Sequence, residues 1–307
     1  MTISRRTILR AGTAGLAAGL FAPLMPRRGW AAATLSLGAA RIDTLSDGHL
    51  VLPMSFVTDH EGAGAVMAEL GISGDAVEPP CNVTLLRDGT NTVLFDVGSG
   101  HDFMPTAGKL AEAMDALGVT AQEITHVVFT HAHPDHLWGL LDEFDEPIFA
   151  DATFMIGKAE WDYWMDPATV DTIGAERQSF AVGAQRRLAA LEDRIVTFGD
   201  GEEIIPGVAA RATFGHTPGH MAYEIRNGSD ACMVLGDCIG NHHLAFARPD
   251  WMSGSDQDPD TGIATRVKLL DQLAAEQMRI VGFHLPDGGL GRVERAGDAY
   301  RFVAEGS

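Results

Sequence analysis

His131-Ala132-His133-Pro134-Asp135-His136 places four potential metal ligands within six residues. The stretch directly follows Thr125–Thr130, an apolar run that is typical of a buried strand. In an extended loop, residues i and i+2 point to the same side, so His131 and His133 can bind one ion together. The stretch therefore predicts a metal site at the end of a strand.

The second half of this stretch predicts a second ion. Pro134 suits the first turn of a helix, where its missing N–H costs little. Such a turn directs Asp135 and His136 away from the first pair, toward a different position. Two ions need about four or five donors each, so other parts of the chain must supply further ligands.

Further candidate ligands follow other predicted strands. They are Gly215-His216-Thr217-Pro218-Gly219-His220, Asp237 after Ala231–Gly236, and His284 after Arg279–Phe283. Layered α/β proteins bind their ligands at the carboxyl ends of strands. These positions are therefore consistent with one site at a shared sheet edge, to which either histidine of the 215–220 segment can contribute.

A weak internal repeat indicates two similar halves. Thr84–Gly98 and Tyr223–Cys238 each run as strand, tight turn and strand, and each contains an aspartate at the end of its second strand, Asp96 or Asp237. Two α/β halves with one site between their edges would explain this pattern. Helices interleaved with mixed strands predict an α/β sandwich with sheets inside and helices outside.

Periodicity predicts the elements of these halves. Helices are expected over Gly108–Leu117, Ala175–Glu192 and Thr265–Met278. Strands are expected over Val83–Leu86, Thr92–Asp96, Thr125–Thr130, Arg194–Phe198, Val208–Phe214, Tyr223–Arg226, Ala231–Gly236 and Arg279–Phe283, the last being the final core strand. No linker divides the chain from Thr34 on, so residues 34–307 are expected to form one domain.

The composition limits the possible classes of protein. The chain has 307 residues, of which 46% are hydrophobic, and this excludes a disordered chain. It has 22 Lys and Arg against 42 Asp and Glu, a net charge of −20, so nucleic acid is not an expected partner. Three cysteines cannot form a disulfide framework, and we expect the thiols to pack in the interior.

Residues 1–33 have the features of an export signal. Ser4-Arg5-Arg6 precedes the apolar run Ala11–Met25, which at 15 residues is shorter than the roughly 20 of a membrane span. Ala31-Ala32-Ala33 supplies the small residues of a cleavage site, and the paired arginines resemble a twin-arginine signal. The mature chain is therefore expected in the periplasm or outside the cell, without a membrane anchor.

Taken together, these segments resemble the metallo-β-lactamase-fold hydrolase superfamily, with its H-x-H-x-D-H motif and later His, Asp and His ligands. The resemblance extends over the whole mature chain. It implies an αββα sandwich in which the metal site lies at the shared edge of two mixed β-sheets.

The resemblance also implies a ligand set. The ligands of the first metal would be His131, His133 and His216. Those of the second would be Asp135, His136 and His284, with Asp237 bridging the two metals. His216 matches the family's ligand better than His220, which would lie behind it, and Asp96 matches an aspartate that braces the histidine loop.

The implied cofactor is two divalent metal ions per chain, zinc being expected first, with manganese, cobalt or iron also compatible with these ligands. The implied reaction is hydrolysis of an ester, lactone or phosphotriester by a metal-bridging hydroxide. Asp135 is the expected catalytic residue, available to pass a proton to the leaving group. The expected partner is a small-molecule substrate, and similar proteins are often homodimers.

Departures from the family pattern indicate which subgroup of the superfamily the sequence resembles. Asp237 is not cysteine, unlike in the common penicillin-cleaving zinc enzymes, and His133 favours hydrolysis over oxygen reduction at a di-iron centre. Gly240 stands where small lactonases carry a tyrosine. The 236–251 and 284–303 stretches resemble the exported methyl parathion hydrolase-like and lactonase-like group. The alternative is a redox or non-catalytic metal protein on the same fold, with one or two irons.

Four aromatic residues are candidates for the walls of a substrate pocket. They are Phe56, Trp138, Trp161 and Trp164. For each of them the sequence is equally compatible with ordinary core packing.

Overall fold

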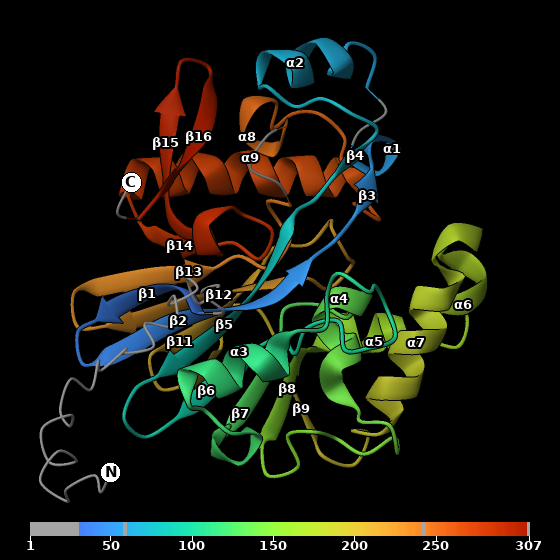
Figure 1. Ribbon diagram of the computed structural model, residues 1–307, viewed down its shortest axis with the longest axis vertical. Helices are drawn as coiled ribbons and strands as arrows, with labels where there is room; N and C mark the ends of the chain where they lie inside the picture. The colour runs from blue at the N-terminus through green and yellow to red at the C-terminus, as the bar shows by residue number, and fades with distance from the viewer. Residues whose placement is uncertain (1–30, 58–59, 241–243, 306–307) are drawn as a thin grey trace, which may run out of the picture.

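The computed structural model describes residues 31–57, 60–240 and 244–305. Two seven-stranded mixed sheets form its centre (Figure 1). The strands of the first sheet, in spatial order, are β1 (Ala31–Leu37), β2 (Ala40–His49), β5 (Pro80–Arg87), β6 (Thr92–Phe95), β7 (His126–Phe129), β8 (Thr153–Gly157) and β9 (Ile195–Phe198). Those of the second are β10 (Glu203–Ile205), β11 (Val208–Ala212), β12 (Met221–Asn227), β13 (Asp230–Val234), β14 (Arg279–Val281), β15 (Leu290–Ala296) and β16 (Ala299–Ala304).

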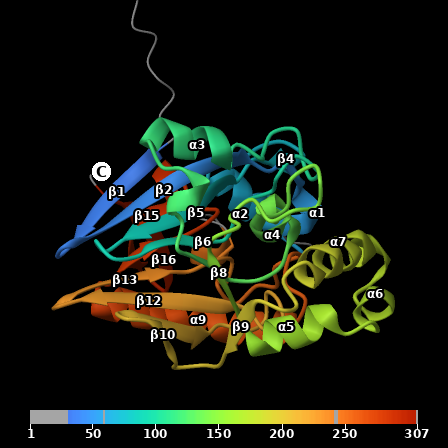
Figure 2. The ribbon, with the colours of Figure 1, turned by 90° about the horizontal axis from the view of Figure 1, so that it is seen from below.

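Helices cover the outer faces of the two sheets. The longer helices are α3 (Leu110–Leu117), α5 (Lys158–Met165), α7 (Gln178–Ala189) and α9 (Pro259–Glu276). The short ones are α1 (Met54–Val57), α2 (Ala63–Glu69), α4 (Pro134–Leu137), α6 (Thr169–Thr172) and α8 (Leu244–Ala247). Figure 2 shows α3 outside the first sheet and α9 outside the second. The predicted α/β fold, an αββα sandwich, is confirmed.

Three apolar layers hold the sandwich together. Between the sheets, Phe95 and Val128 of the first sheet pack with Tyr223 and Val234 of the second. The hydroxyl of Tyr223 also donates a hydrogen bond of 2.5 Å to the carbonyl of Phe129, which joins the two sheets directly. Separate clusters lie between the first sheet and its helices and between the second sheet and α9. Among the described helices, none is long and apolar enough to cross a membrane.

The internal repeat corresponds to the sheet topology. In the first sheet β5 pairs antiparallel with β6, and β6 pairs parallel with β7. In the second sheet β12, β13 and β14 repeat this order with the same directions. The two predicted hairpins thus occupy equivalent places, and both of their aspartates lie at the strand ends.

The prediction that Arg279–Phe283 is the last core strand is wrong. β14 pairs with β15, and β15 with β16, so two further strands complete the second sheet. In β15 the buried apolar residues are only Leu290 and Val293, which are separated by Gly291 and the half-buried Arg292 and followed by Glu294 and Arg295, and this hides the apolar pattern. The predicted cysteine packing is confirmed, since all three thiols are free and buried.

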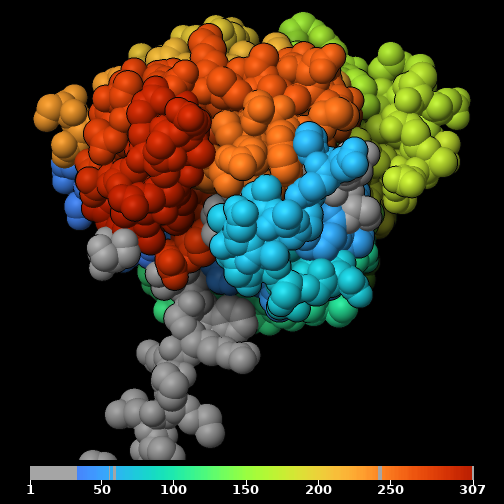
Figure 3. Space-filling model, turned by 90° about the horizontal axis from the view of Figure 1, so that it is seen from above, coloured from blue at the N-terminus to red at the C-terminus, as the bar shows by residue number. Residues whose placement is uncertain are grey.

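The segment between β2 and β5 crosses the carboxyl ends of the strands. It contains α1, α2 and the small sheet of β3 (Leu52–Pro53) and β4 (Ala76–Val77). Figure 3 shows residues around α2 lying against the C-terminal part of the chain. Of the predicted export signal, residues 1–30 lie outside the described residues, and β1 begins at Ala31.

Candidate metal centre

The histidine stretch is placed by β7, an interior strand of the first sheet. β7 lies between β6 and β8, and the chain leaves it at Thr130. Asp96, at the end of β6, accepts hydrogen bonds from Thr130 N at 2.7 Å and Thr130 Oγ1 at 2.8 Å. It also accepts one from His136 Nδ1 at 2.7 Å. The carboxylate therefore braces both ends of the histidine stretch, as the sequence predicts.

Three ring nitrogens meet in a first group. His131 Nε2 lies 3.0 Å from His133 Nδ1, and His133 Nδ1 lies 2.9 Å from His216 Nε2. All three rings are buried. The structure thus brings His216, from the second sheet's loop, onto the two histidines that follow β7.

A second group lies beside the first. His284 Nε2 lies 3.1 Å from Asp135 Oδ2 and 3.2 Å from Asp237 Oδ2. His136 Nε2 lies 3.4 Å from Asp135 Oδ2 and 3.3 Å from Asp237 Oδ1. The four ligand atoms lie within 4.8 Å of one another. Pro134 stands at the first position of α4, so this helix turns Asp135 and His136 toward the second group.

Asp237 connects the two groups. Its Oδ2 lies 3.4 Å from His216 Nε2 of the first group as well as 3.2 Å from His284 Nε2 of the second. The structure therefore brings together all seven residues that the sequence singles out as ligands.

The donor atoms of the second group fit a metal ion. Asp135 Oδ2, His136 Nε2 and Asp237 Oδ1 are buried and find no hydrogen-bond partner among the described residues. His136 Nδ1 faces the carboxylate of Asp96, and His284 Nδ1 faces the carbonyl of Pro80 at 2.8 Å, so both nitrogens carry the ring proton. With the Nδ1 protons fixed in this way, each Nε2 is the ring atom that would give its lone pair to a cation held between the two carboxylates.

The electrostatics of the first group favour neutral rings. Burial, together with the neighbouring imidazoles, holds the pKa of His131 well below its ordinary value. Burial and His216 have the same effect on the pKa of His133. Neutral imidazole is the form that binds metal ions.

The electrostatics of the second group favour positive charge at its centre. Burial opposes ionisation of Asp237, yet His284 and His136 hold its pKa well below the ordinary value. Burial likewise disfavours a charged His284, but Asp237 and Asp135 raise its pKa well above the ordinary value. The carboxylates remain ionised at neutral pH and attract a cation.

His220 lies outside both groups. Its Nδ1 lies 2.8 Å from Thr213 Oγ1, and its Nε2 accepts the backbone N–H of Asp237 at 2.9 Å. Both ring nitrogens are therefore engaged by the protein. His220 positions Asp237 rather than joining the ligand groups.

A buried carboxylate that the sequence does not single out, Glu160, joins two ligand loops. It accepts hydrogen bonds from Ala132 N at 2.9 Å and from Gly219 N at 3.0 Å. The hydroxyl of Thr217 donates to it at 2.7 Å and the indole of Trp164 at 2.5 Å. Glu160 lies in α5 and has no recognisable spacing to the histidines, so no local signal identifies it.

Two further side chains contact the rings of the first group. Asp256 Oδ1 lies 3.3 Å from His216 Nδ1, and its other oxygen accepts from buried Arg266 at 3.1 Å. Gln257 Nε2 lies 3.0 Å from His133 Nε2, and its Oε1 finds no partner among the described residues. With the amide turned over, Oε1 would accept the Nε2–H of His133 and leave Nδ1 free for a metal.

Asn82 fixes the loop that carries His284. Its side-chain amide donates to the carbonyls of Phe283 at 2.9 Å and Leu285 at 2.8 Å. Its backbone N–H donates to Phe283 O at 2.9 Å as well. The first residues of β5 therefore hold His284 at the edge of the opposite sheet.

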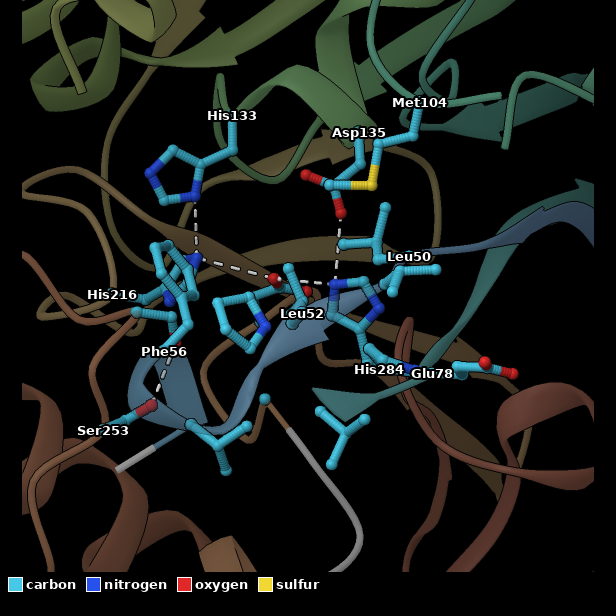
Figure 4. A pocket seen from close by; sticks show the side chains of 18 of the residues that line it. Leu50, Leu52, Phe56, Glu78, Met104, His133, Asp135, His216, Ser253 and His284 are labelled. Atoms are coloured by element: carbon cyan, nitrogen blue, oxygen red, sulfur yellow. Dashed lines mark hydrogen bonds and ion pairs between the residues drawn. The ribbon is translucent and has the colours of Figure 1, made fainter. Parts of the chain in front are cut away.

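A pocket of about 370 Å³ opens above the two groups. His133, Asp135, His216, Asp237 and His284 form its floor, and Figure 4 shows four of these side chains converging. The walls are mainly apolar, and the wall residues are Leu50, Val51, Leu52, Pro53, Phe56, Val57, Val77, Glu78, Pro79, Phe103, Met104, Phe180, Gly240, Ser253 and Ser255. Among the described residues that line the pocket there is no lysine or arginine.

Of the four aromatic candidates, only Phe56 is among the described residues that line this pocket. The Trp138 ring packs under Arg187, whose guanidinium carbon is 4.4 Å from the ring centroid. Trp164 is buried, and Trp161 packs against the same core cluster. The tryptophans thus contribute to the core between the first sheet and its helices.

Comparisons with known proteins agree with this geometry. The family model described as "Metallo-beta-lactamase superfamily" matches residues 76–282. The uncharacterized protein YobT of Bacillus subtilis (strain 168) is 28% identical over 177 residues, which span 55% of this chain and 70% of YobT.

Two solved structures are similar over nearly the whole chain. AidC, a dizinc quorum-quenching lactonase in complex with a product, has a TM-score of 0.83 at 24% identity, covering 90% of this chain and 97% of AidC. The hydrolase AbOPH in the beta lactamase superfamily has a TM-score of 0.82 at 25% identity, covering 89% of this chain and 96% of AbOPH.

Proposed function

The chain belongs to the metallo-beta-lactamase superfamily, and on that premise we propose that it is a metal-dependent hydrolase of uncharged esters, lactones or phosphotriesters. The observation that carries the proposal is the position of the two ligand groups at the floor of an apolar pocket. A substrate in the pocket would lie against the ligand residues that form its floor, which are His133, Asp135, His216, Asp237 and His284.

Two divalent ions would be held by seven residues. His131, His133 and His216 would bind one ion, Asp135, His136 and His284 the other, and Asp237 would bind both. Zinc is the ion we expect, because these ligands are imidazoles and carboxylates. When bound, the ions supply Lewis acidity and lower the pKa of water toward neutrality.

The protein's own groups prepare the site for this chemistry. The imidazoles of His131 and His133 are kept neutral by burial, so they are ready to act as ligands. Asp96, Asn82 and the side chains around Glu160 fix the loops that carry the ligands. Asp135 reaches the pocket, and we propose that its ionised carboxylate accepts a proton from the attacking water and then passes that proton to the leaving group.

The walls of the pocket support an uncharged substrate with an apolar substituent. Without a lysine or arginine among the described lining residues, the walls of the pocket offer no cationic side chain to pair with a carboxylate or phosphate substituent. Glu78 at the lining and the net charge of −20 also disfavour anions. A volume of about 370 Å³ suits a small molecule rather than a polymer.

We also propose that residues 1–33 direct export, so that the hydrolase works in the periplasm or outside the cell. Fractionation of cells that produce the full chain tests this proposal. A lysine pair in place of Arg5 and Arg6 should leave the protein in the cytoplasm. A protein that reaches the periplasm equally well with both sequences would contradict a twin-arginine route.

The proposed hydrolysis is tested by metal analysis of the purified protein together with a panel of an aryl ester, a lactone and a phosphotriester. We expect about two zinc-like ions per chain and turnover of at least one substrate that a chelator abolishes. The variant His216→Ala should lose this turnover, whereas His101→Ala, an exposed histidine outside the pocket, should keep it.

One result would overturn the proposal that the protein is a hydrolase. Iron with a visible absorption band, combined with an inert panel, would instead indicate the redox protein on the same fold.

A further inference from the structure

Three segments that lie far apart in the sequence meet beside the pocket. α1 carries Phe56, the 3₁₀ turn Ala175–Arg177 carries Arg177, and the loop 252–256 carries Gly254. Phe56 and Ser253 both line the pocket, and both are labelled in Figure 4. Arg177 lies on the opposite side of the loop, beside Gly254 and Asp256.

Arg177 joins these segments. Its Nη2 donates a hydrogen bond of 2.7 Å to the carbonyl of Gly254, and its guanidinium carbon lies 5.7 Å from the centroid of the Phe56 ring. Gly254 N in turn lies 3.3 Å from the carbonyl of Val57. One guanidinium therefore contacts Phe56 directly, through the face of its ring, and indirectly, through the backbone of Gly254 and Val57.

Phe56 has little other support. Its neighbour Val57 packs with Met67 and Leu244 in a small cluster that is separate from the main core. Phe56 itself is not part of any of the hydrophobic clusters found among the described residues. The position of its ring therefore depends on Arg177 rather than on packing in a core.

We infer that Arg177 determines the size of the substrate that the pocket accepts, by holding Phe56 as part of the wall. Arg177 is a positioning residue, since it acts on the substrate through Phe56. The inference rests on the proposed function and adds to it the side chain that limits the size of the substrate. Without the guanidinium, the ring loses its cationic partner and α1 loses its bridge to Gly254, so the pocket widens and bulkier acyl chains fit.

The test compares Arg177→Gln with Arg186→Gln. Arg186 is an exposed arginine in α7 that pairs with Asp145, so its substitution removes the same charge away from the pocket. The substrates are p-nitrophenyl esters with acyl chains from acetyl to decanoyl. For Arg177→Gln we expect the ratio of kcat/KM between long and short chains to rise by about tenfold, mainly through KM. Arg186→Gln should leave the ratio unchanged, and Arg177→Lys should shift it less than Gln.

A double variant of Arg177 and Phe56 distinguishes a role of Arg177 in substrate specificity from a general loss of rigidity around the pocket. Phe56→Ala should shift the chain-length ratio in the same direction, and the double variant should behave like Phe56→Ala alone. Additive effects in the double variant, or equal changes of kcat/KM for all chain lengths, would overturn the inference.

A binding measurement distinguishes failure of this inference from failure of the proposed function. The same acyl chains, presented as amides that are not hydrolysed, are titrated by calorimetry against the metal-loaded protein. If neither these esters nor any member of the ester, lactone and phosphotriester panel is turned over, but the length preference for amides shifts in Arg177→Gln, the hydrolase proposal fails and the role of Arg177 stands. If esters are turned over and neither measurement shows a shift, the role of Arg177 is wrong.

Discussion

Asp96 Oδ2 accepts the Nδ1 hydrogen of His136 at 2.7 Å, and this contact fixes which nitrogen of the ring faces the second ligand group. With Nδ1 protonated, Nε2 presents its lone pair to the space between Asp135 and Asp237. The same carboxylate holds Thr130, from which the histidine stretch begins. The orientation of a ligand is thus decided by a residue that does not itself reach the centre.

Asp96→Asn is therefore expected to weaken metal binding while the ligands remain in place. An amide can present N–H to His136 and favour the wrong tautomer, and partners of this kind are worth about 10- to 100-fold in metal affinity. Competition with a chromogenic chelator measures the change. Asp115→Asn, an exposed site on α3, should leave the affinity unaltered. An unchanged affinity in Asp96→Asn would show that His136 is oriented without Asp96.

Asn82→Ala should affect the two ions unequally. The substitution leaves the carbonyls of Phe283 and Leu285 without their amide donor, so the loop that carries His284 loosens. Because His284 belongs only to the second group, we expect metal content to fall from about two ions per chain toward one. Metal analysis after dialysis measures the content. Asn91→Ala, at the opposite end of the same hairpin, is the control, and equal loss of both ions would contradict the explanation.

Two glycines near the centre should respond oppositely to alanine. A Cβ on Gly219 would lie 2.0 Å from the backbone nitrogen of Glu160, which cannot move aside. A Cβ on Gly240 would meet its nearest atoms at 3.7 Å and 3.9 Å, an ordinary contact. Gly219→Ala should lower the free energy of unfolding by more than about 2 kcal/mol, and Gly240→Ala should change it by less than about 1 kcal/mol. Urea unfolding of both variants checks this, and a stable Gly219→Ala protein would refute the close approach.

Asp43 should contribute to stability in a pH-dependent way. Burial opposes its ionisation, but Arg41, Thr34 and Arg87 together lower its pKa below the ordinary 3.8. A carboxylate with a lowered pKa in the folded state stabilises the fold above its unfolded pKa, and this contribution disappears as pH falls through the folded value.

The difference in the free energy of unfolding between the wild type and Asp43→Asn should therefore be constant from pH 7 to about pH 5 and shrink below about pH 4. Urea unfolding across this range measures it. A difference that grows on acidification would mean that the sign of the pKa shift is wrong.

The sequence allowed the ligand positions to be predicted because the spacing of the residues carries the information. His131, His133, Asp135 and His136 lie within six residues, and His216, Asp237 and His284 each follow a strand. The bracing role of Asp96 is implied by the resemblance to the metallo-β-lactamase-fold superfamily, and the repeat of the two hairpins places Asp96 in the position equivalent to Asp237. The fold class followed from the same residues together with the alternation of strands and helices.

The supporting residues could not be predicted in this way. Glu160 contacts Ala132 and Gly219, which are 28 and 59 residues away, and Asn82 contacts Leu285 across 203 residues. Such pairs leave no local pattern, since any buried carboxylate or amide would look alike in the sequence. The sequence leaves open for a similar reason whether Trp138 faces the pocket or the core, because the direction of its ring depends on where Arg187 of α7 lies.

The division of the ligands between the two sheets has a consequence for how the protein is made. The stretch 131–136 precedes His216, Asp237 and His284 in the chain, so neither ligand group is complete until synthesis has reached the second sheet, the first group at His216 and the second at His284. Metal uptake therefore reports that both halves have folded and docked. A chain interrupted before residue 284 would lack one residue of the second ligand group however well its first sheet had formed.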